Sequence, residues 1–197
     1  MSWVAIIVTF ALVDNAILAR LLGVCPDITE QGRMKGAVQI GIAMTILMTV
    51  SSIGAWAVED FILAPLGLSF LQTPLFLFLV LGVGFLLELL ATRVIPGFAP
   101  APGFSMAEVG INSASLGIVL VVARSDMTGA ESLVAGFATG VGYFLVTAMM
   151  IAIRERLEVE QVPRFLRGFP LHLISAGLLA YAFMAFDRAF LARILGS

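Results

Sequence analysis

The stretch from Asp14 to Cys25 places an acid, an amide, an arginine and the only cysteine of the chain inside or beside one apolar run. That run begins at Trp3 and has the length and composition of a membrane span. An ionisable group at bilayer depth costs about 3 kcal/mol or more unless it is paired. The stretch therefore predicts a functional site, a packed helix interface or a water-lined cavity.

A second polar interruption, Gly110 to Ser115, lies about half a chain further on. It contains Asn112 and Ser113 in another apolar run. Two such interruptions in one membrane chain are typical of a site built from paired, broken helices. We expect the two stretches to be partners.

Several side chains in and near these stretches allow more than one chemistry. Asp14 and Asn15 could bind a cation with unwound backbone carbonyls, or Asp14 could pair with Arg20 or with a basic group on a neighbouring chain. Asn15 and Asn112 could also act as interhelical hydrogen-bonding residues, worth about 1 kcal/mol each. Cys25 has no cysteine to bond with in the chain, so it is packing, a reactive thiol or a metal ligand.

The spacing between these groups constrains the first helix. An unbroken helix from Asn15 would place Cys25 about 15 Å along its axis. For Cys25 to share a site with Ser113 near the membrane midplane, the first helix must break or dip.

Two further acids lie in predicted spans. Glu88 is within about one helical turn of Arg93, which favours an ion pair, while a proton or sodium relay is the alternative. Glu108 enters the fourth predicted helix just ahead of Asn112 and has no obvious local partner. All these acids are candidates for an ion path or a polar core.

The composition identifies an integral membrane protein that contacts the lipid bilayer. The 197 residues are 60% hydrophobic and 12% charged, with a mean hydropathy of +1.08. No soluble domain of this size buries so much apolar surface. A net charge of −2 argues against a nucleic-acid partner, and the sequence has no phosphate loop, nucleophilic triad or dinucleotide fingerprint.

The hydropathy pattern predicts an all-α protein with six transmembrane helices. The apolar windows are 3–24, 36–58, 70–92, 104–123, 131–153 and 169–191. Six spans place both termini on one side. The first, third and fifth loops carry Arg33, Lys35, Arg93, Arg154, Arg156, Arg164 and Arg167, against Arg124, Arg188 and Arg193 on the other side. The positive-inside rule therefore predicts extracytoplasmic termini.

The two halves of the chain, 1–95 and 96–197, repeat each other. Asn15 and Asn112 are 97 residues apart, Gly41 and Gly136 are 95 apart, and Pro74 and Pro170 are 96 apart. Because each half holds three spans, the halves must enter the membrane in opposite directions. This predicts two inverted three-helix repeats with interrupted first helices.

Four segments resemble the RnfA/NqrE family over nearly the whole chain. They are Asn15–Pro26, Pro65–Leu68 with Glu88 downstream, Asn112–Gly117, and Ile153–Leu157 followed by Val162 and Pro163. The resemblance implies a core membrane subunit of an Rnf-type electron transport complex. Such complexes couple ferredoxin–NAD or NADH–quinone electron transfer to Na⁺ or H⁺ movement across a bacterial or archaeal inner membrane.

The resemblance also implies a cofactor and partners. A paralogous RnfE/NqrD-like subunit would share one 2Fe-2S cluster with this chain, and other subunits would carry flavin and iron–sulfur groups. Cys25 matches the first cysteine that the family supplies, whereas Ser113 stands at the second. A serine oxygen is a harder and more basic ligand than a thiolate.

The departures from the family pattern leave alternatives. Asp14 stands where the family usually has Asn, and Ala107–Glu108 where it usually has Pro-Leu. The chain could hold a cluster with Ser113, hold it only through Cys25 and the partner, or lack it. A chain that lacks the cluster would be a scaffold or ion-path subunit. A third possibility is a stand-alone inverted-repeat transporter. In each case we expect no catalysis by the isolated chain.

Overall fold

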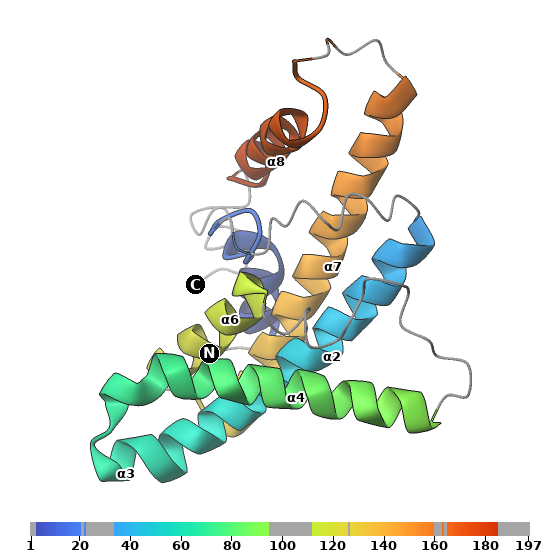
Figure 1. Ribbon diagram of the computed structural model, residues 1–197. Helices are drawn as coiled ribbons and strands as arrows, with labels where there is room; N and C mark the ends of the chain where they lie inside the picture. Colours follow the sequence, from blue (N-terminus) through green and yellow to red (C-terminus); the bar gives the residue numbers. More distant parts are fainter. Residues whose placement is uncertain are drawn as a thin grey trace.

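The computed structural model describes residues 3–20, 22, 34–94, 112–125, 127–159, 163 and 165–184. All regular structure in these residues is helical (Figure 1). The elements are α1 (Trp3–Val8), η1 (Thr9–Val13), α2 (Met34–Val58), η3 (Glu59–Leu63), α3 (Ala64–Leu66), η4 (Ser69–Leu71), α4 (Gln72–Val94), α6 (Ser113–Arg124), α7 (Gly129–Val159) and α8 (Phe169–Phe183). Of these, η1 and η3 are π-helical and η4 is a 3₁₀ turn.

Each predicted apolar window overlaps one described helix or run of helices. Three runs are long and apolar enough to cross a membrane: Gly41–Leu66, Gln72–Leu90 and Gly129–Leu157. Three apolar helices are shorter in the described residues: Trp3–Val13, Ser113–Arg124 and Phe169–Phe183. The all-helical, multi-pass class is confirmed, and the predicted Pro/Gly linker at 96–103 lies outside the described residues.

The second predicted span is longer than its apolar window. The window ends at residue 58, but the helix continues through η3 and α3 to Leu66. Gly67 then stops it with a left-handed backbone, φ 67°, which glycine adopts without strain. Glu59 therefore lies within a helix and not in a loop.

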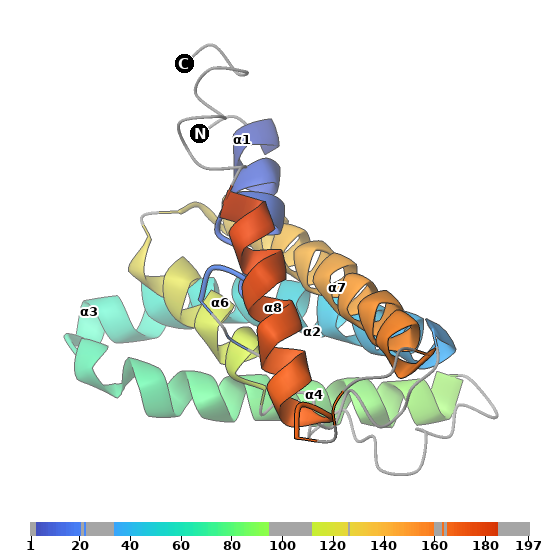
Figure 2. The ribbon, with the colours of Figure 1, turned by 90° about the horizontal axis from the view of Figure 1, so that it is seen from above.

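The centre of the molecule is the antiparallel pair α2 and α7, which lie side by side in Figures 1 and 2. Gly140 faces Thr45, Gly136 faces Met48 and Ser52, and Gly129 faces Trp56. A Cβ at Gly136 would lie 2.6 Å from Ser52 Oγ, so only glycine allows this approach. Small residues give close backbone packing where lipid removes the hydrophobic drive between helices.

The first helix of each predicted half packs against the other half. α1 and η1 lie against α7, while α6 lies against α2. α4 also contacts α2 and α6, and α8 contacts α7 (Figure 2). The first helix of each predicted half thus rests on the second helix of the other half.

The outward surfaces of these helices are apolar. Phe78 on α4 is 71% exposed and Leu178 on α8 is 67% exposed. Exposed apolar area of this extent is unfavourable in water but favourable against lipid or another subunit.

Candidate site at two helix breaks

The first helix breaks at Asn15, whose side chain is 1% exposed. Its Nδ2 donates to the Ala11 carbonyl at 2.8 Å, and its Oδ1 accepts from the Ile17 N–H at 3.0 Å. The amide therefore satisfies one backbone group on each side of the break. A new turn begins at once, because the Ala19 N–H donates to the Asn15 carbonyl at 2.9 Å.

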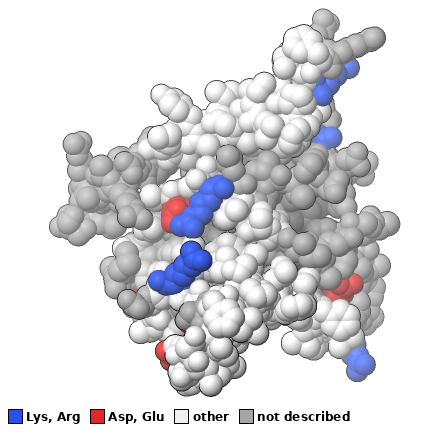
Figure 3. Space-filling view, turned by 60° about the vertical axis from the view of Figure 1, so that its left-hand side comes forward, with Lys and Arg blue, Asp and Glu red and all other residues white. Residues whose placement is uncertain are grey.

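An ion pair spans the same break. Arg20 donates through Nη2 to Asp14 Oδ2 at 2.8 Å and through Nε to Oδ1 at 3.2 Å. Both carboxylate oxygens are engaged, so of the two interpretations of Asp14, the geometry favours pairing over cation binding. The side chains are 41% and 24% exposed for Arg20 and Asp14. Figure 3 shows that charged side chains are sparse on the face of the molecule that it presents.

The ion pair borders a small recess of about 10 Å³ between three elements. Asp14 and Arg20 line it from the break, Gly117 and Ile118 from α6, and Thr139 from α7. The volume suits about one water molecule. The break is therefore in contact with α6, and Leu22 fills the space over Gly117.

At the second predicted interruption, the Asn112 side chain caps the backbone as the Asn15 side chain does at the first. Asn112 has an extended backbone, φ −62° and ψ 131°, and caps α6 through Oδ1, which accepts from the Ala114 N–H at 3.1 Å. This repeats the contact from Asn15 to the second residue after it. The Asn112 Nδ2 donates to the Tyr143 hydroxyl at 3.1 Å. Ser113 follows as the first residue of α6, with an exposed side chain.

Adjacent residues of α7 bring the two asparagines together. Gly142 touches the first break, where an added Cβ would lie 2.6 Å from the Ala11 carbonyl and 2.8 Å from Asn15 Nδ2. Tyr143, next along α7 and 1% exposed, holds Asn112. The structure thus brings Asn15 and Asn112 to one level of the bundle, with α7 between them.

The sequence of residues 3–189 matches the model of one protein family, which is described as "Rnf-Nqr subunit, membrane protein". The chain belongs to the Rnf-Nqr family. It is similar to the A subunit of the ion-translocating oxidoreductase complex of Edwardsiella ictaluri, with 36% identity over 94% of this chain and 96% of the relative.

Two other relatives of this Rnf-Nqr chain are also A subunits of such complexes. The A subunit of the ion-translocating oxidoreductase complex of Sodalis glossinidius is 37% identical over 89% of this chain and 91% of that protein. The A subunit of the Na⁺-translocating ferredoxin:NAD⁺ oxidoreductase complex of Acetobacterium woodii is 33% identical over 95% and 97%.

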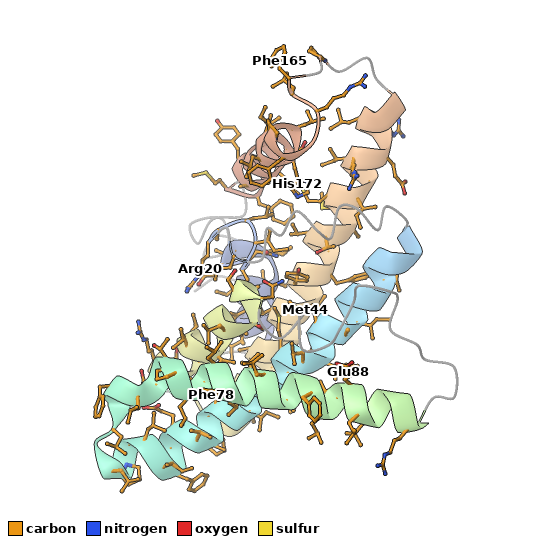
Figure 4. All side chains as sticks on the ribbon, in the orientation of Figure 1. Arg20, Met44, Phe78, Glu88, Phe165 and His172 are labelled. Carbon is orange, nitrogen blue, oxygen red and sulfur yellow. The ribbon has the colours of Figure 1, made fainter. Side chains whose placement is uncertain are left out.

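One further predicted site residue of this Rnf-Nqr protein, Glu88, lies away from the two asparagines (Figure 4). Glu88 is half-buried on α4 and lies away from Arg20 in Figure 4. Cys25 and Glu108 lie outside the described residues. Within the described part of the chain, no three His, Cys, Asp or Glu side chains come together to hold a metal ion.

Sequence reasoning missed Gly142 and Tyr143. Both lie in the apolar run of α7, where a glycine and a tyrosine are common. Tyr143 had one signal in the sequence: a hydroxyl in the middle of a span needs a hydrogen-bond partner when it is buried. Gly142 had no such signal.

Proposed function

We propose that this chain is a core membrane subunit of an Rnf-type complex that couples ferredoxin/NAD(H) electron transfer to Na⁺ or H⁺ translocation. It would help carry electrons across the membrane at a site shared with a paralogous RnfE/NqrD-like subunit. The observation that carries this proposal is the pair of buried or capped amides at Asn15 and Asn112, which interrupt the apolar bundle where a shared site between interrupted helices is expected. The names and full-length similarity of the relatives support it.

The architecture we propose is two inverted repeats of three spans. Two observations support it. Asn15 and Asn112 make the same backbone-capping contact. Thr45 and Gly140, which pack against each other, are 95 residues apart, the same spacing as Gly41 and Gly136. A two-fold axis between α2 and α7 would pass through that contact and would exchange the helices that α1 and α6 pack against.

The cofactor we propose is a 2Fe-2S cluster shared with the partner, which would supply one-electron transfer. Cys25 and Ser113 are the residues of this chain that would hold it. Ser113 fits in position, since it is exposed beside the capped end of α6, where a helix terminus favours negative charge. It fits less well in chemistry, because its hydroxyl must lose a proton to act as a ligand.

The protein's own residues would set the shape of this site. Asn15 and Asn112 hold the two chain breaks, and Tyr143 fixes the second amide. The Asp14–Arg20 pair contributes two charges that offset each other, so the first break adds little net charge. We place the chain in the cell (inner) membrane with both termini extracytoplasmic, on the basis of its loop arginines.

The test uses the complex purified through a tag on this chain. We expect other membrane, flavin and iron–sulfur subunits to copurify, and dithionite-reduced samples to show a 2Fe-2S EPR signal that Cys25→Ala removes. Leu178→Ala, an exposed change on α8, is the matched control and should leave the signal intact. Ser113→Cys should keep the iron and alter the signal's g values.

The alternative functions give different results in the same experiment. A cluster-less scaffold or ion-path subunit predicts no loss of iron or signal with Cys25→Ala. A stand-alone transporter predicts a monodisperse chain that is active in liposomes without partners. Either result would overturn the proposed electron-carrying role.

A further inference from the structure

An arginine and a histidine come together where α7 meets α8. Arg154 lies on α7 and His172 on α8, and both side chains are half-buried. They are close enough for the positive charge of Arg154 to act on the imidazole. Figure 4 shows His172 on the side of α8 that faces α7. Two side chains with N–H donors, supplied by different helices, are suited to bind one anion between them.

Helical spacing explains why these two side chains meet. Arg154 follows Met150 by four residues, and His172 precedes Ala176 by four. Met150 and Ala176 are buried in the same hydrophobic core. Residues four apart share one face of a helix. Arg154 and His172 therefore continue the packed faces of α7 and α8 by one turn, and they lie at the edge of the contact between these helices.

Part of the Arg154 guanidinium is buried at this edge. The group carries five N–H donors, and its Nη1 is buried and makes no hydrogen bond within the part of the chain that the structure describes. His172 cannot balance the charge of Arg154, because an imidazole is either neutral or positive. Buried N–H groups in folded proteins nearly always have an acceptor. An anionic oxygen beside Nη1 would satisfy both the donor and the charge.

The surroundings of this pair indicate the headgroup layer of a membrane. The segment between α7 and α8 belongs to the loop whose arginines predict a cytoplasmic location. Phe165 and Phe169 at the same end are 78% and 52% exposed, and Phe165 lies at the end of the molecule in Figure 4. Exposed rings of this size are favourable against lipid and unfavourable in water. The pair therefore lies where a span leaves the bilayer.

The outer face of α8 adds an apolar surface beside the pair. Leu173, Ile174 and Leu178 follow His172 along α8 and are 46%, 48% and 67% exposed. A phospholipid held by its phosphate at Arg154 and His172 would place its acyl chains along this face. A free phosphate ion would leave the face unused. The two adjacent surfaces together fit a phospholipid.

We propose that Arg154 and His172 bind the phosphate group of an anionic phospholipid at the predicted cytoplasmic end of α7 and α8. The planar fork of the guanidinium matches two phosphate oxygens, and the imidazole N–H can donate to a third. Basic pockets between membrane helices on the cytoplasmic side bind anionic headgroups. Exposed side chains nearby favour an anionic lipid over a zwitterionic one, because the described ones include two arginines and one acid: Arg156, Arg167 and Glu155. Binding does not depend on the proposed electron-transfer function.

The experiment is photolabelling of the purified complex with phosphatidylglycerol that carries a photoreactive group in one acyl chain, followed by mass spectrometry of its peptides. We expect labelling of α8 between Leu173 and Leu178. In Arg154→Gln, half-maximal labelling should need about tenfold more lipid. Arg156→Gln removes the same charge from an exposed arginine two residues on, and this matched control should stay within about twofold. Arg154→Lys keeps the charge but loses the fork, and should need about threefold more lipid.

The outcomes separate the site from general attraction to the membrane. Wild-type labelling in Arg154→Gln overturns the proposal, and so does an equal loss in Arg156→Gln. If Arg154→Gln does not assemble, wild-type labelling in both Arg154→Lys and His172→Gln overturns it instead.

Competition identifies what is bound. Unlabelled phosphatidylglycerol should displace the photoreactive lipid, whereas phosphatidylcholine and inorganic phosphate should not. Displacement by inorganic phosphate would identify a free-anion site, and displacement by phosphatidylcholine would identify lipid contact without charge recognition. Labelling that no lipid displaces would mean that Arg154 is held by an acidic side chain of another subunit. Each of these three results contradicts an anionic phospholipid as the ligand.

Discussion

Gly142→Ala tests whether α7 sets the geometry of the first break. The added Cβ would lie 2.6 Å from the Ala11 carbonyl oxygen, whereas ordinary contact begins near 3.4 Å. The first helix must therefore move by about 0.8 Å, or the bond from Asn15 Nδ2 to that carbonyl must open. Overpacking of this kind costs about 1–3 kcal/mol, and loss of the hydrogen bond adds about 1 kcal/mol.

The matched control is Gly82→Ala on α4, where an added Cβ meets nothing within 4 Å. Both changes gain the helix propensity of alanine, about 1 kcal/mol, so the difference between them isolates the contact. We expect Gly142→Ala to unfold with a free energy about 2–4 kcal/mol lower than Gly82→Ala. The assay is titration with a denaturing detergent from mixed micelles, followed by circular dichroism. Equal stability of the two variants would refute the assigned packing.

Three further substitutions address the remaining contacts in the same unfolding assay. Tyr143→Phe removes the acceptor of Asn112 Nδ2 and should cost about 1–2 kcal/mol, because a part-buried donor is left without its partner. Asp14→Asn should cost about 1 kcal/mol, since it removes the charge that Arg20 faces, and its partial exposure limits the effect. Thr128→Ala should cost about 1 kcal/mol by removing the cap hydroxyl, which donates to the Glu131 carboxylate at 3.1 Å and accepts from the Glu131 N–H at 3.4 Å.

Each of these has an outcome that would contradict its reason. Tyr143→Phe at wild-type stability would mean that water replaces the hydroxyl at Asn112. If Arg20→Gln added to Asp14→Asn cost as much again, the two charges would not be acting as a pair. An unchanged helix stability in Thr128→Ala would show that the α7 terminus is held by its packing alone.

The sequence was sufficient to predict which segments form helices and that a polar stretch begins at Asp14 in the first of them. Apolar windows locate the helices because a backbone in lipid must satisfy its own hydrogen bonds. Asn15 and Asn112 were detectable because an amide stands out in an apolar run. The second helix runs past its apolar window, which ends at residue 58, because the backbone stays helical through Glu59 to Leu66.

The residues of α7 that contact Asn15 and Asn112 could not be predicted from the sequence, and the reason is physical. In a membrane helix, the face toward lipid and the face toward protein are both apolar, so periodicity does not show which side is buried. Gly142 and Gly82 look alike in sequence, yet one touches a carbonyl and the other faces open space. Only the crossing of α1 and α7 separates them.

Asn15 and Asn112 make the same side-chain contact with the backbone but differ in the charge beside them. Each asparagine accepts from the N–H two residues later, so each break can form without its neighbours. The first break adds an ion pair that bridges residues 14 and 20, whereas the second adds a neutral bond from Asn112 to Tyr143. Because charged bonds weaken with ionic strength and neutral ones do not, salt should loosen the first break selectively. Hydrogen exchange at residues 15–20 and 112–116, compared at low and high salt, would measure that difference. An equal change in protection at both segments on adding salt would contradict it.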